Sequence, residues 1–555
     1  MNYRNEQRID GKMFEAFIMG GAGMLQENID RINALNVFPI PDGDTGYNMY
    51  RTLSGGIRET QKASDSTVGA KAQALAAGML FSARGNSGVI LSQIFAGIGN
   101  ALEPYETATV KQLAESFISG YRQAYDTVVS PVEGTILTVA REPIELLYPS
   151  IGDDMTLGDF ADAFLPLMNT TLKNTPELLD VLKKAGVIDS GGAGLYLIAQ
   201  GATQVLSGER VYSETINVSP APSDIDLSLF SQDSVFEYGY CTEFLLRLMT
   251  AKTDVESFDE NIIIDYLNTI GDSIVVFKNG SIIKVHVHTF TPHKALEFCQ
   301  QFGEFLTVKI ENMMLQHNEH EHKKNADLPT ADKARQHHAV CVVASGSGMI
   351  AVFKELGADC VIDGGQGKNP AIGDFIAAFD ALNADNIYVF PNNSNILMAA
   401  EQAGKLYTKS AVHVIPSINL GQAYAGLSML DYSYDTPEEI RQNFIDSINY
   451  VETGMVCRAI RNVDYPELSV RKDDYIGFVY KNILSDNPDK IAALKELCES
   501  LKIADKEIAT VIYGAEATDN DRENVRSLFR SDYADKEFYE IDGGQEIYDF
   551  IVVLE

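Results

Sequence analysis

The hydrophobic pattern changes twice along the chain and divides it into three parts. Over residues 13–35 apolar positions recur every three or four residues, which predicts helix, and Ala-rich stretches such as KAQALAAGML continue the helical character. Convincing strand patterns are scarce before about residue 210. We therefore predict an all-α N-terminal domain over residues 1–210.

The second part begins after a polar stretch. Residues 211–235 are rich in Ser, Pro and Asp, a composition typical of a linker. The segment SIVVFKNGSIIKVHVH then predicts two apolar strands joined at Asn279-Gly280, a dipeptide that favours a type I′ hairpin. Because helical patterns flank this hairpin, we predict a small α/β middle domain over residues 236–315.

The third part alternates short apolar runs with helical patterns. After a second predicted linker at 316–338, the runs AVCVVAS, DCVID, NIYVFP and AVHVIPS are each followed by a helical pattern. This alternation predicts a parallel sheet, and we predict an α/β domain over residues 339–555. Ligands bind beyond the carboxyl ends of such strands. The polar residues at these ends are Ser345, Gly364-Gly365-Gln366, Asn392-Asn393-Ser394 and Ser417, and ordinary turn chemistry is the alternative explanation for them.

The net charge and the cysteine content indicate which ligands and which cellular compartment to expect. The chain has 44 Lys and Arg against 78 Asp and Glu, a formal charge of −34. This charge argues against non-specific binding to nucleic acid or anionic membranes, although metal ions still allow a nucleotide to bind. Its six cysteines form no CxxC pair, and no segment reads as a signal peptide or a spanning helix. We expect a soluble, cytoplasmic protein.

The densest motif is NVFPIPDGDTGYNM, residues 36–49. Asp42 and Asp44 stand on either side of Gly43, so both carboxylates can turn toward one point. Such hard oxygen ligands suit Mg²⁺, which binds one or two carboxylates together with phosphates, and Asn36 offers a further oxygen. The alternative is a turn that only caps the following helix, since Asp-Gly is a common turn pair.

Three further segments place small or polar residues at the start of a predicted helix. The first is SARGNSG at 82–88, where Gly85, Asn86, Ser87 and Gly88 would expose backbone N–H groups to an anion. Tight helix packing through glycine is the alternative. The other two segments are PVEGTIL at 131–137 and DSGGAG at 189–194.

Together, the segments NVFPIPDGDTGYNM, SARGNSGVILSQ, PVEGTILTV and DSGGAGL resemble the nucleotide-binding (DhaL) domain of dihydroxyacetone kinases. More closely, the whole chain resembles the ATP-binding kinase subunit of bacterial fatty acid kinase (FakA-like). The resemblance implies an eight-helix barrel that binds ATP at one end, a small α/β middle domain and a DegV-like α/β C-terminal domain.

The resemblance also implies roles for individual residues. Asp42 and Asp44 match catalytic positions that, with Asn36, hold a pair of Mg²⁺ ions, although Asn36 replaces the Asp usual in dihydroxyacetone kinases. The positions that match the nucleotide site are Asn48, Gly85, Asn86, Ser87, Gly88, Thr135 and Asp189.

The middle domain carries a second candidate metal site. His286 and His288 lie two apart on a predicted strand and so share one face, and Cys241 could add a thiolate. A buried cysteine with two ordinary strand histidines is the alternative. The resemblance implies that Cys241, His286 and His288 bind Zn²⁺, which we interpret as a structural or interface-forming site.

The histidine content bears on the phosphate acceptor. No histidine precedes His286, so the N-terminal domain has no imidazole base for a hydroxyl acceptor. A carboxylate acceptor is already ionised at pH 7 and needs no such base. The resemblance implies the same chemistry: ATP-dependent phosphorylation of a fatty acid presented by a separate fatty-acid-binding protein (DegV/FakB-like), and a possible homodimer.

Two other functions stay open at this point. One is a small-molecule kinase of the dihydroxyacetone type, against which the absence of histidine argues. The other is a non-catalytic scaffold that senses ATP or lipid, against which the intact DGDTG and GNSG motifs argue.

Overall fold

We describe the protein from a computed structural model. The described residues are 2–36, 43–209, 240–255, 258–267, 269–279, 281–312, 335–430, 436–464 and 468–555. They form two compact units, one from residues 1–218 and 329–555 and the other from residues 219–328, and each is treated by itself.

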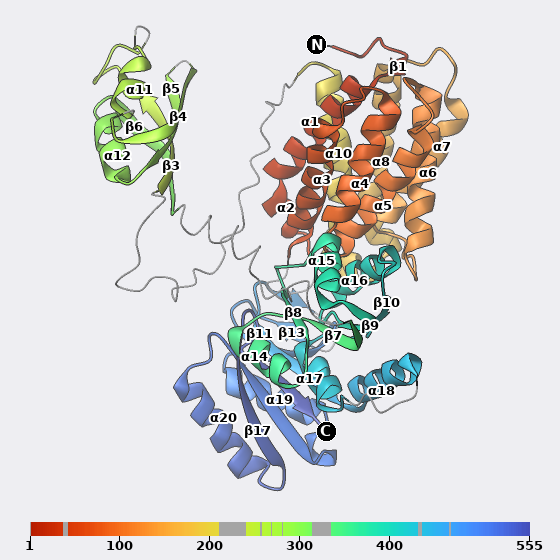
Figure 1. The fold of residues 1–555 in the computed structure, drawn as a ribbon, viewed down its shortest axis with the longest axis vertical. Coiled ribbons are helices and arrows are strands. Elements are labelled where there is room, and N and C mark those ends of the chain that lie inside the picture. Colours follow the sequence, from red (N-terminus) through yellow and green to blue (C-terminus); the bar gives the residue numbers. More distant parts are fainter. Residues whose placement is uncertain are drawn as a thin grey trace. The chain divides into compact units, whose positions relative to one another are not determined.

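The N-terminal part of the first unit is helical, as predicted (Figure 1). Its long helices are α1 (Gly11–Glu27), α3 (Thr45–Lys62), α4 (Val68–Ser82), α5 (Gly85–Leu102), α6 (Val110–Thr127), α7 (Ile136–Leu147), α8 (Leu157–Leu178) and α10 (Ser190–Leu206). Two short helices are α2 (Ile29–Asn33) and α9 (Asp180–Ala185), and β1 (Arg8–Ile9) pairs with β2 (Ala108–Thr109).

The predicted helical stretch at 13–35 is broken at Asn28. The side chain of Asn28 donates a hydrogen bond to the Met24 carbonyl oxygen at 2.8 Å, so it competes for a carbonyl at the C-terminal end of α1. The chain then turns into α2. This break brings the end of α2 close to the start of α3, where the Asn33 side chain accepts from the Gly46 N–H at 2.8 Å.

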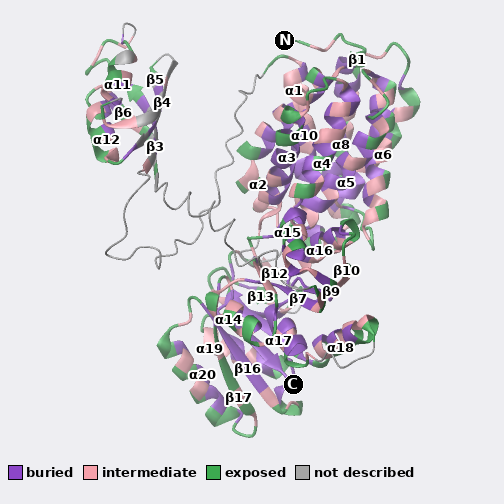
Figure 2. Cartoon of the chain, in the orientation of Figure 1, coloured by how far each residue is buried: buried purple, intermediate pink, exposed green. Residues whose placement is uncertain are grey.

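Each long helix packs against neighbours on both sides. α1 contacts α3 and α10, α5 contacts α4 and α6, and α7 contacts α6 and α8. Buried residues lie on the inner faces of these helices, while exposed residues lie on the outside (Figure 2). A single hydrophobic core therefore runs through the N-terminal part.

The second unit is a small antiparallel sheet with two helices. Its elements are β3 (Tyr240–Leu248), α11 (Asn261–Leu267), β4 (Gly271–Asn279), β5 (Ile282–Thr289), α12 (Pro292–Gln300) and β6 (Gly303–Asn312), with strand order β4-β5-β3-β6. β4 and β5 pair antiparallel with Asn279 opposite Ile282, which confirms the predicted hairpin. The core contains Phe244, Leu246 and Val285.

The C-terminal part begins with a four-stranded parallel sheet. Its strand order is β10-β9-β7-β8, and the strands alternate with helices, which confirms the predicted alternation. The elements are β7 (Gln336–Ala344), α14 (Ser347–Glu355), β8 (Cys360–Asp363), α15 (Ile372–Leu382), β9 (Ala384–Phe390), α16 (Ser394–Leu406), β10 (Ala411–Val414), α17 (Leu420–Ser428) and α18 (Pro437–Tyr450). Since β7 starts at Gln336, the last residues of the predicted linker belong to a strand.

The second half of the C-terminal part forms a separate, mostly antiparallel sheet, which the four apolar runs did not predict. There a six-stranded sheet has the order β15-β14-β11-β18-β16-β17, and only β16 and β17 pair in parallel. β14 and β15 are joined by two residues, which is too short for a parallel crossover, and Tyr480 in this turn has φ 54°. The elements are β11 (Glu452–Arg458), β12 (Val463–Asp464), β13 (Ser469–Val470), β14 (Tyr475–Val479), β15 (Asn482–Asn487), α19 (Lys490–Ser500), β16 (Ile508–Gly514), α20 (Asp519–Asp532), β17 (Glu537–Gln545) and β18 (Phe550–Leu554).

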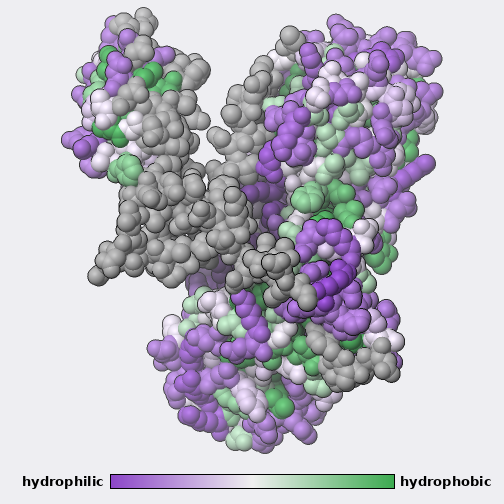
Figure 3. All heavy atoms as spheres, in the orientation of Figure 1, coloured by the Kyte–Doolittle hydropathy of each residue, from purple (hydrophilic) through white to green (hydrophobic). Residues whose placement is uncertain are grey.

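The surface of the described parts carries both hydrophilic and hydrophobic residues. Hydrophilic residues gather over α20 at the outer side of the six-stranded sheet (Figure 3). None of the described helices is both long enough and apolar enough to span a bilayer. Among the described residues, no disulfide joins Cys299, Cys341, Cys360, Cys457 or Cys498.

Candidate active site

The structure gathers four helix N-termini at one end of the helical part. The residues that precede α3, α5, α7 and α10 are Asp44, Arg84, Thr135 and Asp189. The Ser190 hydroxyl lies 3.3 Å from the Thr45 hydroxyl, which joins the starts of α10 and α3. These helices come from distant parts of the sequence, so the predicted motifs form one site.

The other helix N-termini lie close to one another or to a neighbouring helix. A Cβ on Gly191 would lie 3.2 Å from Ile136 Cβ, so α10 and α7 start side by side. A Cβ on Gly85 would lie 2.5 Å from the Asn48 side-chain nitrogen, and Gly85 has φ 58°. Glycine is therefore required at the start of α5 both by space and by backbone conformation.

The N-terminus of α5 packs closely against α3. No side chain caps it, and the backbone of Gly88 is so close to α3 that a Cβ there would lie 2.4 Å from the Thr52 hydroxyl. Uncapped N–H groups at the positive end of a helix favour a phosphate group. The glycine packing that was the alternative explanation is therefore present, and anion binding at this helix start stays a prediction.

The carboxylates of the first motif are only partly described. Asp42 lies outside the described residues. Asp44 is partly buried at the start of α3, and its backbone carbonyl accepts from the Asn48 N–H at 2.8 Å. Asn36 lies close by, because a Cβ on Gly43 would be 3.7 Å from Asn36 Cβ.

Two carboxyl groups at this end of the helical part have raised pKa values. Burial raises the pKa of Asp44 to about 6, although hydrogen bonds from the side chains of Asn48 and Asn369 act in the opposite direction. Burial also raises the pKa of Asp189 to about 6, against hydrogen bonds from backbone N–H groups such as that of Gly192. A buried carboxylate without a counter-charge is costly, so a cation beside Asp44 would lower its free energy.

Thr135 and Asp189 also serve as ordinary helix caps. The Thr135 hydroxyl accepts from the Leu137 N–H at 3.4 Å, and the Asp189 carboxylate accepts from the Gly192 N–H at 2.7 Å. The caps explain why these residue types stand there. Their position beside the other helix starts is consistent with the nucleotide role that the resemblance implies.

Sequence reasoning missed a set of residues from the C-terminal part. The Asn369 side-chain nitrogen donates to the Asp44 carboxylate, and the Arg84 guanidinium donates to the Asn369 carbonyl oxygen at 2.9 Å. Arg84 also pairs with Asp374 at 3.6 Å. No pattern in the sequence could link Asn369 to a residue 325 positions away.

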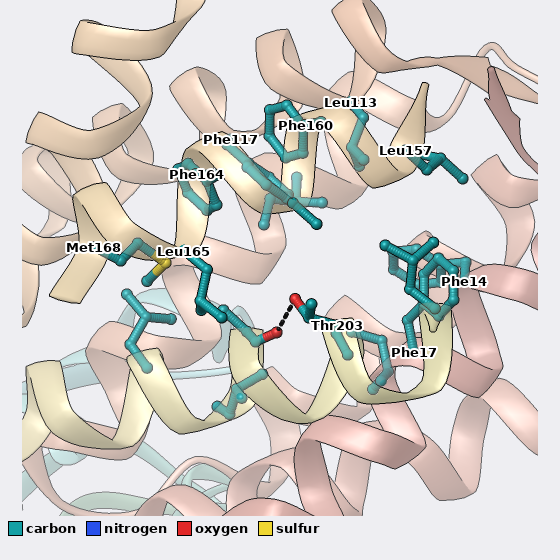
Figure 4. A pocket seen from close by; sticks show the side chains of 18 of the residues that line it. Phe14, Phe17, Leu113, Phe117, Leu157, Phe160, Phe164, Leu165, Met168 and Thr203 are labelled. Carbon is teal, nitrogen blue, oxygen red and sulfur yellow. Dashed lines mark hydrogen bonds between the residues drawn. The ribbon is translucent and has the colours of Figure 1, made fainter. Parts of the chain in front are cut away.

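A large apolar cavity lies within the helical part (Figure 4). It holds about 1130 Å³ of space not filled by atoms, part of it open to solvent. Phe14, Phe117, Phe160 and Phe164 point into it from α1, α6 and α8. The Thr203 hydroxyl, a rare polar group in the lining, bonds to the Ala199 carbonyl oxygen at 3.0 Å, so the wall offers little to a polar ligand.

The predicted zinc site is described only in its backbone. The register of β3 and β5 pairs Cys241 with His288 and Glu243 with His286, so the three predicted ligands stand on neighbouring strands. The side chains of Cys241, His286 and His288 lie outside the described part. Among the described residues, no group of three or more His, Cys, Asp or Glu is placed to hold a metal.

A crevice of about 440 Å³ that includes open solvent is lined by some of the strand-end residues of the parallel sheet, namely Ser345, Gly364, Gly365, Gln366 and Asn392. Two of these residues bond to strand-end residues outside the lining: the Ser417 hydroxyl donates to the Asn392 side-chain oxygen at 2.7 Å, and the Asn393 amide donates to Gln366 at 3.1 Å. Turn and loop bonding thus accounts for much of this polar cluster.

Comparison with known proteins identifies the family. Family profiles match residues 339–555 (FakA-like fatty acid kinase, C-terminal domain), 39–204 (DAK2 domain) and 237–320 (FakA-like fatty acid kinase, middle domain). The chain belongs to the FakA-like fatty acid kinase family. An uncharacterized protein of Staphylococcus aureus (strain USA300) is 35% identical over 99% of this chain and 100% of its own length.

Other relatives agree with this family. An uncharacterized protein of Staphylococcus saprophyticus is 34% identical to this FakA-like chain over 99% of it and 100% of the relative. A solved structure described as fatty acid binding of a DegV family protein from Thermus thermophilus shares 11% identity, with a TM-score of 0.30, and covers 40% of this chain and 100% of that one. The likeness to that structure is slight, and the family assignment does not depend on it.

The described residues fit a polyphosphate with a divalent cation. The Asp44 carboxylate is a hard oxygen donor that burial leaves without a full counter-charge, and the uncapped α5 N-terminus lies beside it. These are the two kinds of group that a metal-bound nucleotide requires. A kinase of the DAK2 type would bind ATP.

Proposed function

We propose that this protein transfers the γ-phosphate of ATP to the carboxylate of a fatty acid, giving an acyl phosphate. The observation that carries the proposal is the meeting of four helix N-termini with the Asp44 carboxylate at one end of the helical domain. Support comes from the FakA-like family assignment over most of the chain. The closed order of helix contacts further supports an eight-helix barrel.

We propose one group of residues for binding the metal ions and another for binding the nucleotide. Asn36, Asp42 and Asp44 would hold two Mg²⁺ ions, which neutralise charge that develops during phosphoryl transfer. The residues that would bind the nucleotide are Asn48, Gly85, Asn86, Ser87, Gly88, Thr135 and Asp189. Because the chain is strongly acidic, ATP binding depends on metal between carboxylate and phosphate.

The phosphate acceptor that the site favours depends on whether the acceptor must lose a proton. The helical domain has no histidine. Of the two described carboxyl groups at its site, Asp189 caps α10, and we assign Asp44 to the metal as part of this proposal. A fatty acid carboxylate brings its own negative charge and needs no base. We propose that a separate DegV/FakB-like protein carries the fatty acid, and that Cys241, His286 and His288 bind Zn²⁺ in a middle domain spanning 236–315.

A small-molecule kinase of the dihydroxyacetone type is the competing function. One observation favours it: a carboxyl with a pKa of about 6, such as Asp44, could accept a proton from a hydroxyl. The cation that we place beside Asp44 removes this advantage, because it would hold the carboxylate ionised.

The test is ATP consumption by the purified chain with Mg²⁺. Oleate is supplied with and without a fatty-acid-binding protein from the same organism, and dihydroxyacetone is supplied separately. We expect turnover only when fatty acid and binding protein are both present. Turnover with dihydroxyacetone alone would contradict the proposal and establish the small-molecule kinase.

A further inference from the structure

One loop of the C-terminal part reaches Asp44 in the candidate ATP site. Asn369 precedes α15 and is 3% exposed, and its side-chain nitrogen donates to the Asp44 carboxylate. Its backbone carbonyl oxygen accepts from the Arg84 guanidinium at 2.9 Å. A Cβ on Gly85 would lie 3.2 Å from the Asn369 nitrogen, so this side chain also stands over the start of α5.

This contact rests on a shared hydrophobic core. Ala83 and Val89, on either side of the α4–α5 junction, are fully buried in one cluster with Ile372 and Phe375 of the C-terminal part. The backbone joins the two parts as well, since the Ile372 N–H donates to the Ala83 carbonyl oxygen at 3.2 Å. An apolar contact of this kind holds the loop at the site, whereas a polar contact alone would allow it to separate easily.

One atom at this contact has no partner. The Asn369 side-chain oxygen is buried without a hydrogen bond. A buried amide oxygen without a donor is costly, and such atoms call for an explanation such as a bound ion or water. Both amide atoms belong to one planar group, so this oxygen lies near the same carboxylate that the nitrogen contacts.

An amide oxygen and a carboxylate are both ligands that Mg²⁺ prefers. Without a cation, the amide turns its nitrogen to the Asp44 carboxylate, which is the favourable arrangement for a donor and an anion. With a cation beside Asp44, the arrangement reverses, because the oxygen then faces a positive charge. The same side chain can satisfy Asp44 in both states by a rotation of its amide.

We propose that Asn369 is a further ligand of the divalent cation at Asp44, supplied to the ATP site by the C-terminal part. The inference rests on the proposed function, since it concerns the same site. It makes the C-terminal part a component of the nucleotide site in addition to any role in meeting the acyl carrier.

The test measures Mn²⁺ binding to the full-length chain with ATP, by electron paramagnetic resonance, because Mn²⁺ takes the same oxygen ligands as Mg²⁺. Asn369→Leu keeps the approximate size and removes the oxygen, and we expect Mn²⁺ affinity to fall at least tenfold. Asn369→Asp keeps an oxygen, and we expect it to bind Mn²⁺ as tightly as the wild type or more tightly. The control is Lys368→Ala, an exposed neighbour whose ammonium pairs with Asp363, and it should bind within twofold of the wild type.

The melting temperature distinguishes a metal-ligand role of Asn369 from a purely structural role. In Asn369→Asp two carboxylates face each other without metal, so its melting temperature should fall in the metal-free protein and rise more on adding Mn²⁺ than that of the wild type. If Asn369→Leu binds Mn²⁺ within twofold of the wild type, or if Asn369→Asp weakens binding as much as Leu does, the proposal is wrong. If wild-type protein itself binds no Mn²⁺ with ATP, the proposed function fails, which is a distinct result.

Discussion

At the residue scale, the site is defined by carboxyl groups that are held where water is scarce. Asp44 and Asp189 come from motifs that lie about 145 residues apart, yet burial raises the pKa of both to about 6. The sequence predicted Asp44 from the two carboxylates of its motif, whereas the role of Asp189 came from the resemblance to the DhaL domain. It could not predict Asn369, whose neighbours arise only from the packing of the C-terminal part.

Asp189 gives a prediction about stability and pH. Its pKa is about 6 in the folded chain against an ordinary value of 3.8, so between these two pH values the folded state binds more protons and the free energy of unfolding falls as pH rises. Asp189→Asn keeps a helix cap and removes this penalty. We expect the variant to gain stability over the wild type from about pH 4 to pH 6 and to keep that gain above pH 6, up to ~3 kcal/mol.

Urea denaturation at several pH values checks this expectation. Asp65→Asn, in the exposed loop between α3 and α4, controls for the loss of a carboxylate. Parallel stability curves for Asp189→Asn and the wild type would show that the Asp189 carboxyl titrates normally.

At the element scale, the sequence predicted the helices but not the place where four of their N-termini come together. Periodicity showed helix before residue 210 and an alternating α/β pattern after residue 339, and both are present. The break at Asn28 and the antiparallel strands of the second sheet depend on local bonding and on short turns, such as that at Tyr480, which periodicity does not report. Four loop-to-helix junctions could be found separately, but their convergence required the fold.

Gly85 provides a prediction at this scale. Gly85→Ala places a side chain in a left-handed backbone conformation and 2.5 Å from the Asn48 nitrogen. Gly186→Ala is a matched control, because Gly186 has φ 65° and nothing within 4 Å of a Cβ. We expect Gly186→Ala to cost about 1 kcal/mol of unfolding free energy from backbone strain, and Gly85→Ala to cost more.

ATP affinity distinguishes the two glycines further. Gly85→Ala moves Asn48 and the start of α5, so ATP should bind several-fold more weakly, while Gly186→Ala should bind normally. Equal affinities of the two variants, measured by calorimetry with Mg²⁺, would show that the start of α5 does not contact the nucleotide.

At the scale of the whole molecule, the N- and C-terminal parts of the first unit share a core. Ile372 is fully buried with Ala83 and Val89, so it stabilises both parts at once. The sequence predicted separate domains from changes in composition, and family profiles match each of them. It could not show that the α4–α5 junction is covered, because the apolar residues there read as part of an ordinary helix.

Ile372→Ala tests this shared core. The substitution removes buried apolar volume, and we expect a loss of about 2–4 kcal/mol of unfolding free energy. We also expect faster hydrogen exchange at Ala83 through Val89, because that segment loses its cover. Leu528→Ala, buried in a different cluster near α20, should reduce stability without changing exchange at the α4–α5 junction.

The most direct test of the account is to trap the product. Hydroxylamine converts an acyl phosphate into a hydroxamate, so the full-length chain is incubated with ATP, Mg²⁺, oleate and a fatty-acid-binding protein in its presence. We predict ATP-dependent oleoyl hydroxamate from the wild type and a loss of at least a hundredfold in Asp44→Asn. ATP hydrolysis without hydroxamate, or equal hydroxamate from Asp44→Asn, would contradict a carboxyl acceptor or the role of Asp44, respectively.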